Sequence, residues 1–162
     1  MSLLDGANNL PNRRQPAPHL QSLDWQGTIV FVTASARFRR DYFCTPQAVA
    51  VLHRVWSDPS RWQVGEYVIM PDHVHLFARP CCAGEHGLRM WVAWWKRLVA
   101  RELGMSVWQP GVWDVRMRSA ETYAEKREYV RQNPVRAGLA LSPDEWSYRG
   151  KIHDLMWRGP IE

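Results

Sequence analysis

Two histidines stand one residue apart, at His73 and His75, directly after the dipeptide Pro71-Asp72. Residues at i and i+2 of a β-strand point to the same face of the sheet, so the two imidazoles can bind one ion. Two neutral imidazoles leave coordination positions of the metal open, which is typical of catalytic sites rather than structural ones. With 6 His in 162 residues, about 0.2 such pairs arise by chance, so the pair gains meaning only from a further ligand and a nucleophile.

Tyr129 and Asn133 form a second pair, in a segment that ends at Pro134. Their i, i+4 spacing places the phenol and the amide on one face of a helix. The amide oxygen of Asn133 suits a hard divalent cation and can complete a three-ligand set with His73 and His75. A simpler interpretation stays open, in which Asn133 is a helix-terminal residue before proline and Tyr129 packs against the domain.

The elements that must position these side chains follow the order β-α-β-β-α-β-α. Strands are predicted over 28–35, 61–70, 73–79 and, broken by Pro110-Gly111, 107–118. Helices are predicted over 45–58, with Thr45 as N-cap, over 86–103, ended by Gly104, and from the cap Ser119 to Asn133. The order matches the split βαβ motif, so we expect an α+β, ferredoxin-like fold with a central antiparallel sheet and helices mainly on one face.

The length of the chain allows one domain and is too short for two. We expect a flexible basic, proline-containing arm over 1–24, the domain over 25–150 and a tail over 151–162. The net charge of +5, the pI near 9.4 and 10 Trp predict a surface that is both basic and aromatic, as in nucleic-acid-binding proteins. Most of the tryptophans, Trp91 and Trp95 among them, are expected in the core.

Three cysteines, Cys44, Cys81 and Cys82, lack the spacing of a zinc quartet or a disulfide framework. This indicates a reducing compartment. The sequence has no apolar run of about 18 residues and no signal-peptide pattern, so we expect a soluble cytoplasmic protein.

Four stretches together resemble the REP-associated tyrosine transposases, a branch of the single-tyrosine HUH transposases, where HUH means histidine, bulky hydrophobic residue, histidine. The stretches are 37–40 (RFRR), 68–75 (VIMPDHVH), 108–114 (WQPGVWD) and 129–139 (YVRQNPVRAGL). The resemblance covers roughly residues 25–149. The last stretch is long and the order of the four is that of the family, which makes the match specific.

The resemblance implies the HUH endonuclease fold and a metal-dependent nuclease and strand transferase. Its substrate would be single-stranded DNA at hairpins of repetitive extragenic palindromes. Tyr129 matches the nucleophile, which forms a 5′-phosphotyrosine link, and His73, His75 and Asn133 match the metal ligands. The implied cofactor is Mg²⁺ or Mn²⁺, although two imidazoles alone favour zinc or another late transition metal. A monomer working in cis and associated with the bacterial nucleoid is implied, with a homodimer as the alternative.

Attack by a tyrosine on a phosphodiester needs activating groups, and the sequence identifies only some of them. A free phenol titrates near pH 10, so a tyrosine nucleophile needs activation, and a cation that neutralises phosphate charge also stabilises the transition state. Asp72 and Asp114 are the carboxylates considered as a general base. Two alternatives remain open: a domesticated protein that binds hairpin DNA without cutting it, and a metal hydrolase that activates water and leaves Tyr129 as a packing residue.

Contacts to DNA phosphates are expected from basic side chains, with exposed aromatic rings stacking on unpaired bases. The basic side chains predicted for this role are Arg37, Arg39, Arg40, Arg89, Lys96, Arg97, Arg127, Arg131 and Arg136.

Overall fold

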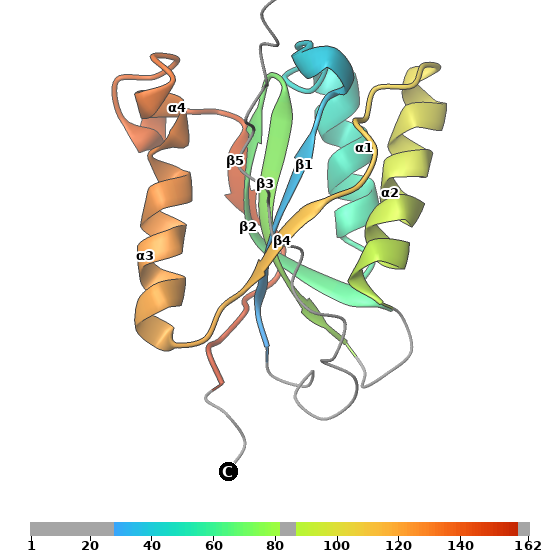
Figure 1. The fold of residues 1–162 in the computed structure, drawn as a ribbon. Coiled ribbons are helices and arrows are strands. Elements are labelled where there is room, and N and C mark those ends of the chain that lie inside the picture. The colour runs from blue at the N-terminus through green and yellow to red at the C-terminus, as the bar shows by residue number, and fades with distance from the viewer. Residues whose placement is uncertain (1–27, 82–86, 159–162) are drawn as a thin grey trace, which may run out of the picture.

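Five strands form one antiparallel sheet in the order β4-β1-β3-β2-β5 (Figure 1). The computed structural model describes residues 28–81 and 87–158, so the predicted arm over 1–24 lies outside the described residues. The strands are β1 (Val30–Ser35), β2 (Trp62–Met70), β3 (His73–Pro80), β4 (Trp113–Arg116) and β5 (Arg149–Lys151). The helices are α1 (Pro46–Trp56), α2 (Leu88–Leu103), α3 (Ala120–Arg131) and α4 (Asn133–Arg136), with 3-10 turns η1 (Arg37–Arg39) and η2 (Pro143–Glu145).

The connections explain the strand order. Helix α1 links β1 to β2, which run parallel with β3 between them, and α2 links β3 to β4 in the same way with β1 between them. This interleaving of two βαβ units is the ferredoxin-like arrangement, and the predicted fold class is confirmed. The pattern did not predict β5, since a strand of three residues is too short to show a period; it pairs with the outer edge of β2.

Helices cover both faces of the sheet, which corrects the expectation of helices mainly on one face (Figure 1). Helices α1 and α2 lie on one face, over a cluster that includes five tryptophans: Trp56, Trp62, Trp91, Trp95 and Trp108. Helices α3 and α4 lie on the opposite face, where α3 buries Tyr123 and Val130 against Phe31 and Phe77. The strands can serve both layers because successive side chains alternate between the two faces.

Local signals in the sequence place most of the helix ends correctly. Thr45 caps α1 by accepting a hydrogen bond from the Ala48 amide, and Gly104 ends α2 with a positive φ of 69°. Ser119 caps α3 in a reciprocal capping box with Thr122. These contacts satisfy the free backbone groups at the helix ends.

Two predicted boundaries need correction. The chain does not leave helical geometry at Asn133: α4 begins there, because Pro134 occupies the first turn, where a missing amide proton costs no helical hydrogen bond. The strand predicted over 107–118 shrinks to β4, preceded by an isolated bridge between Ala36 and Trp108, since the turn at Gly111 interrupts the pairing.

The predicted C-terminal tail begins inside β5, and its residues Leu155 and Trp157 pack on the α3 side of the sheet. The Leu155 side chain is buried there, and the Trp157 ring stacks on Tyr123 with centroids 6.1 Å apart. The Arg79 guanidinium donates to the Met156 carbonyl over 3.1 Å. Within the described ranges no helix combines the length and hydrophobicity that a membrane span requires.

Candidate metal and nucleophile site

The two histidines lie at the start of β3, directly after the two-residue turn that joins it to β2. Both side chains lie on the face of the sheet that carries α3, as their spacing predicts. Their Nε2 atoms are 3.1 Å apart. The two imidazoles therefore direct one nitrogen each at a common point.

Each imidazole forms a hydrogen bond through Nδ1, the ring nitrogen that does not face the other histidine. The His73 Nδ1 group donates to the Asp72 carboxylate over 2.7 Å, and His75 Nδ1 lies 2.8 Å from the Thr33 hydroxyl. A carboxylate or hydroxyl at Nδ1 fixes the orientation of the ring and leaves the Nε2 lone pair for a ligand. Thr33 can donate or accept, so it tolerates either tautomer of His75.

Burial keeps both histidines neutral at neutral pH. The pKa of His75 is lowered to about 3 by burial, with smaller contributions from His73, Lys126, Arg136 and Arg39. Burial also lowers the pKa of His73, opposed by its hydrogen bond to Asp72. Neutral imidazole is the form that binds a metal ion, so the environment suits ligation.

Asn133, at the start of α4, meets the histidines on the same face of the sheet. Its Nδ2 group lies 3.3 Å from His73 Nε2, although the two residues are 60 positions apart in the chain. Rotation of the amide by half a turn presents Oδ1 at the same place, because the two ends of a carboxamide have nearly the same shape. Asn133 therefore lies beside the histidines as predicted, while its role as a metal ligand stays a prediction.

Tyr129 lies one helical turn before Asn133 and is 56% exposed. The Arg136 guanidinium lies over its ring, 3.9 Å from the centroid, and also donates to the Tyr129 carbonyl. Lys126 Nζ lies 5.2 Å from the Tyr129 ring and equally far from the Phe31 ring, which stacks on His75. The phenol thus belongs to a cationic patch that adjoins the histidine pair.

The carboxylates considered as general bases have other roles. Asp72 contacts His73 through Oδ1 and Arg39 through Oδ2, over 3.1 Å, so both of its oxygens are engaged. Asp114 pairs with Val32 and lies on the opposite face from the histidines. Burial raises the pKa of Asp114 while Arg89 opposes this shift, and its position on the opposite face separates this carboxyl from the Tyr129 phenol.

The arginines predicted to bind DNA divide by position. Arg37, Arg39 and Arg40 are exposed in and after η1, next to the β2-β3 turn, and Arg39 pairs with Asp72. Arg136 lies against Tyr129. The structure brings these four side chains to the end of the sheet that holds the histidines.

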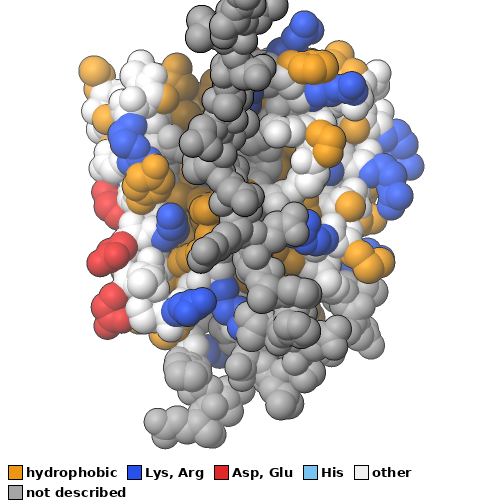
Figure 2. Space-filling view, in the orientation of Figure 1, with side chains coloured by type: hydrophobic (Ala, Val, Ile, Leu, Met, Phe, Trp, Pro, Cys, Tyr) orange, Lys and Arg blue, Asp and Glu red, His pale blue; other side chains and the backbone are white. Residues whose placement is uncertain are grey.

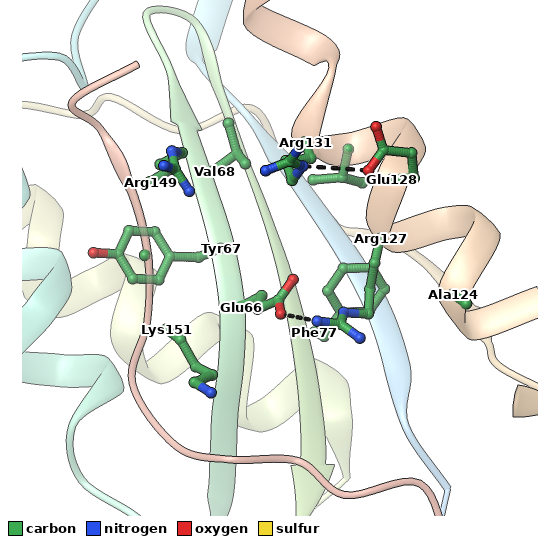
Figure 3. Close-up of a pocket in the computed structure, with 12 residues that line it drawn as sticks. Glu66, Tyr67, Val68, Phe77, Ala124, Arg127, Glu128, Arg131, Arg149 and Lys151 are labelled. Carbon is green, nitrogen blue, oxygen red and sulfur yellow. Dashed lines mark hydrogen bonds and ion pairs between the residues drawn. The ribbon is translucent and has the colours of Figure 1, made fainter. Parts of the chain in front are cut away.

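Arg127 and Arg131 line a groove between α3 and the β2-β5 edge (Figure 3). Arg127 forms an ion pair with Glu66, and Arg131 contacts Glu128 and Asp144, each over 3.2 Å. Carboxylates therefore neutralise much of the positive charge in this groove, so it favours DNA less than the cationic patch at Tyr129 does.

The basic residues of α2 do not join the site. Arg89 and Arg97 are exposed on the other side of the sheet from the histidines. Lys96 is a correction: it is only 9% exposed, and its ammonium donates to the Gln109 and Gly111 carbonyls over 2.8 and 2.6 Å. Its charge holds the loop before β4 and is not available to phosphate.

In Figure 2, lysine and arginine side chains are spread over both sides of the visible face, while acidic side chains gather at its outer α3 edge. Net charge alone therefore does not locate a DNA path on this molecule. The side chains at the histidine end give a more specific guide, because they combine cations with exposed rings: Phe38, Trp113 and Tyr129.

Sequence reasoning missed three residues of the site. Thr33 holds His75 because β1 and β3 pair in a register that puts the two opposite each other. Phe31, two residues earlier on β1, stacks on the same imidazole with ring centroids 5.2 Å apart. Lys126 is the one for which a signal existed, since it precedes Tyr129 by three residues on a helix and so lies on the same face.

The residues present fit a divalent metal ion. In the described part of the chain no three His, Cys, Asp or Glu side chains gather into a metal-binding group, so a site here depends on Asn133 as a third protein ligand. Two converging neutral Nε2 atoms with a carboxamide beside them leave further positions for water or phosphate. That donor set suits a catalytic metal more than a structural one.

Comparisons with known proteins agree with the motifs. No family model matches the chain. The chain is similar to the REP-associated tyrosine transposase of Escherichia coli (strain K12), with 23% identity over 151 residues that cover 84% of this chain and 88% of that protein. It also matches a solved structure of a REP-associated tyrosine transposase bound to a REP hairpin, with a TM-score of 0.68 and 20% identity, over 88% of this chain and 97% of the other. The predicted resemblance and the predicted fold are both confirmed.

Proposed function

We propose that this protein is a metal-dependent endonuclease and strand transferase that acts on single-stranded DNA at palindromic hairpins. The observation that carries the proposal is the convergence of His73, His75 and Asn133, with the exposed Tyr129 one helical turn away. The similar protein whose structure is described as bound to a REP hairpin supports hairpin DNA as the substrate.

The proposed reaction exchanges one phosphodiester for another. The Tyr129 phenol loses its proton as its oxygen attacks the phosphorus, the bond from phosphorus to the 3′ oxygen breaks, and that oxygen takes up a proton. The products are a 5′-phosphotyrosine and a free 3′-hydroxyl. The reverse attack by another 3′-hydroxyl rejoins DNA, and no nucleoside triphosphate is needed because the number of phosphodiester bonds is unchanged.

This chain's own side chains hold and polarise the reacting groups. Lys126 and Arg136 lie against the Tyr129 ring, where they would attract the scissile phosphate to the phenol. Asp72 and Thr33 keep the two imidazoles oriented. A bound Mg²⁺ or Mn²⁺ would neutralise phosphate charge and position the leaving oxygen.

A monomer that works in cis is part of the proposal. Asn133 lies beside His73, and Tyr129 precedes Asn133 by one helical turn in the same chain. This supports a monomer that works in cis.

The test is a covalent trapping experiment. The protein is incubated with a labelled palindromic hairpin that carries single-stranded flanks, with Mg²⁺ or Mn²⁺, and then resolved under denaturing conditions. We expect a denaturant-stable protein–DNA adduct that EDTA prevents. Tyr129→Phe should abolish the adduct, whereas Tyr123→Phe, the matched control in a buried ring of the same helix, should retain it.

Each alternative has its own outcome. Hairpin binding without any adduct would show a non-cleaving binding protein. Cleavage without an adduct, unchanged in Tyr129→Phe, would show a hydrolase that uses water. An adduct that persists in Tyr129→Phe and disappears in Tyr123→Phe would show that the nucleophile is Tyr123, on another face of α3.

A further inference from the structure

The turn that follows β1 contains two consecutive non-glycine residues with positive φ. Phe38 has φ 56° and ψ 21°, and Arg39 has φ 54°. The left-handed region is unfavourable for a bulky side chain because Cβ approaches the backbone too closely. Such strain persists only where the surroundings impose it, and it concentrates at binding and catalytic sites.

The strained turn presents an aromatic ring to solvent. Phe38 is 75% exposed, compared with 56% for Tyr129 and 39% for Trp113. The Arg37 guanidinium lies 5.1 Å from the ring centroid. An apolar ring in this setting contributes little to the core, so burial of the ring does not offset the strain.

Hydrogen bonds hold the turn on both sides. The Ala36 amide donates to the Asp72 carbonyl over 2.8 Å, and the Arg37 amide donates to the Val107 carbonyl over 2.8 Å. Beyond the turn, the Tyr42 amide donates to the Pro71 carbonyl over 2.9 Å. These bonds tie the turn to the β2-β3 hairpin and to the segment before β4, so the ring projects from a fixed base.

The turn also adjoins the candidate site. Ser35, three residues before Phe38, is the β1 partner of His73. The Arg39 guanidinium contacts Asp72, whose other oxygen holds His73. A ligand on the Phe38 ring would therefore lie near the same end of the sheet as the proposed metal ligands.

We propose that Phe38 is a stacking platform for one unpaired nucleobase in the single strand that flanks the hairpin, with Arg37, Arg39 and Arg40 on the neighbouring phosphates. The proposal rests on the DNA substrate of the proposed function. An aromatic ring stacks on any base, and guanidinium groups pair with phosphates, so the two kinds of side chain match the alternation of base and phosphate in a single strand. The DNA substrate of the proposed function supplies both the anionic phosphates and the flat ring faces that these side chains require, which favours it over a protein partner.

Equilibrium binding of two DNA probes tests the proposal. One probe is a labelled palindromic hairpin with a single-stranded 5′ extension, and the other has the same extension paired to a complementary strand. Phe38→Ala should weaken binding of the first probe by about 5- to 150-fold, the range of one lost stacking contact, and leave the second within about twofold. Phe38→Trp should restore binding, and Leu141→Ala, which removes an exposed apolar side chain elsewhere, should have no effect.

An abasic scan of the extension identifies the stacked base. In the wild type, one abasic position should weaken binding by a factor comparable to Phe38→Ala, and in the Phe38→Ala variant the same abasic position should cost nothing further. Equal binding of the first probe by wild type and Phe38→Ala would overturn the proposal, as would an abasic penalty that is the same in both proteins.

The covalent adduct separates this inference from the proposed function. If the wild type forms the adduct and Phe38→Ala binds the extension as tightly as wild type, only the stacking role fails. If the wild type shows the Phe38-dependent binding but no adduct, the stacking role holds and the nuclease fails. If the wild type does not distinguish the two probes, the stacking role is wrong.

Discussion

The two faces of the sheet use the same strands for different purposes. On the face under α1 and α2, β3 contributes Val74 and Leu76 to a core rich in tryptophan. On the face under α3, the same strand contributes His73, His75 and Phe77, and the surface changes from apolar to polar toward the β2-β3 turn. Because side chains alternate along β3, neighbouring residues of this strand belong either to the core or to the candidate site.

Two lysines show the same contrast. Lys96 on α2 is buried and donates to two loop carbonyls. Lys126 on α3 lies against the rings of Tyr129 and Phe31 beside the histidines. A positive charge on a helix is therefore weak evidence for DNA binding, because the fold decides whether the charge meets carbonyl groups or the open site.

The sharpest test of the contrast substitutes neighbouring residues on β3. We expect His75→Ala to reduce adduct formation by more than about a hundredfold, since a metal ligand is lost, and to lower the free energy of unfolding less than removal of an apolar side chain from the core. Leu76→Ala should instead lower the free energy of unfolding by about 2 to 5 kcal/mol, the cost of a cavity in a packed core. Urea unfolding and adduct yield measure the two effects. A folded Leu76→Ala protein that loses the adduct as completely as His75→Ala would break the distinction between the faces.

Acid should lower the stability of the protein partly through His75. The pKa of His75 falls from 6.5 to about 3 on folding, so the unfolded chain binds more protons between these values, and the free energy of unfolding drops as the pH decreases through this window. The expected contribution is a few kcal/mol. Urea unfolding at several pH values should show a smaller loss in His75→Leu than in wild type. Parallel pH curves for the two proteins would contradict this assignment.

Removing each lysine charge compares the two helices directly. Lys96→Met should lower the free energy of unfolding by about 1 to 3 kcal/mol, because two carbonyls lose a charged donor, and should leave hairpin affinity unchanged. Lys126→Met should weaken hairpin binding or adduct formation by about tenfold at nearly constant stability. Each variant loses one positive charge, so each is the control for the other. Similar effects on DNA binding would show that net charge, and not position, governs affinity.

The smallest expected difference concerns local stability. Helix α1 buries five residues: Ala48, Val51, Leu52, Val55 and Trp56. Helix α3 buries only Tyr123 and Val130, so it should open locally before the domain unfolds. Native-state hydrogen exchange should show amides in the middle of α3 about tenfold less protected than those in α1. Equal protection in the two helices would mean that α3 unfolds only together with the core.

Local features were predictable because short-range backbone physics sets them. The strand alternation that puts His73 and His75 on one face, the caps at Thr45 and Ser119 and the stop at Gly104 depend on neighbours in the chain. The resemblance to the transposases rested on such segments as well. The error at Asn133 came from the same level, since a proline can open a new turn as well as end a helix.

The Lys96 prediction failed for a different reason. Lys96 follows Val92 by four residues and so lies on the buried stripe of its helix, but its residue type indicated a solvent-exposed position. A long side chain can bury its methylene groups and still find polar partners. The partners here are carbonyls of the loop before β4, and no local pattern predicts that this loop lies within reach of α2.

The sequence alone determined the residue types, the face on which each strand side chain lies and the order of the elements, because these depend on covalent geometry and nearest neighbours. Tertiary structure decided that Thr33 contacts His75 and that Asn133 lies beside His73, 60 residues away in the chain. It also decided that the Lys96 ammonium donates to carbonyls of the loop before β4. These contacts depend on strand register and helix packing, which many weak interactions across the whole domain set together. The histidine pair is a local fact; the site around it is a property of the fold.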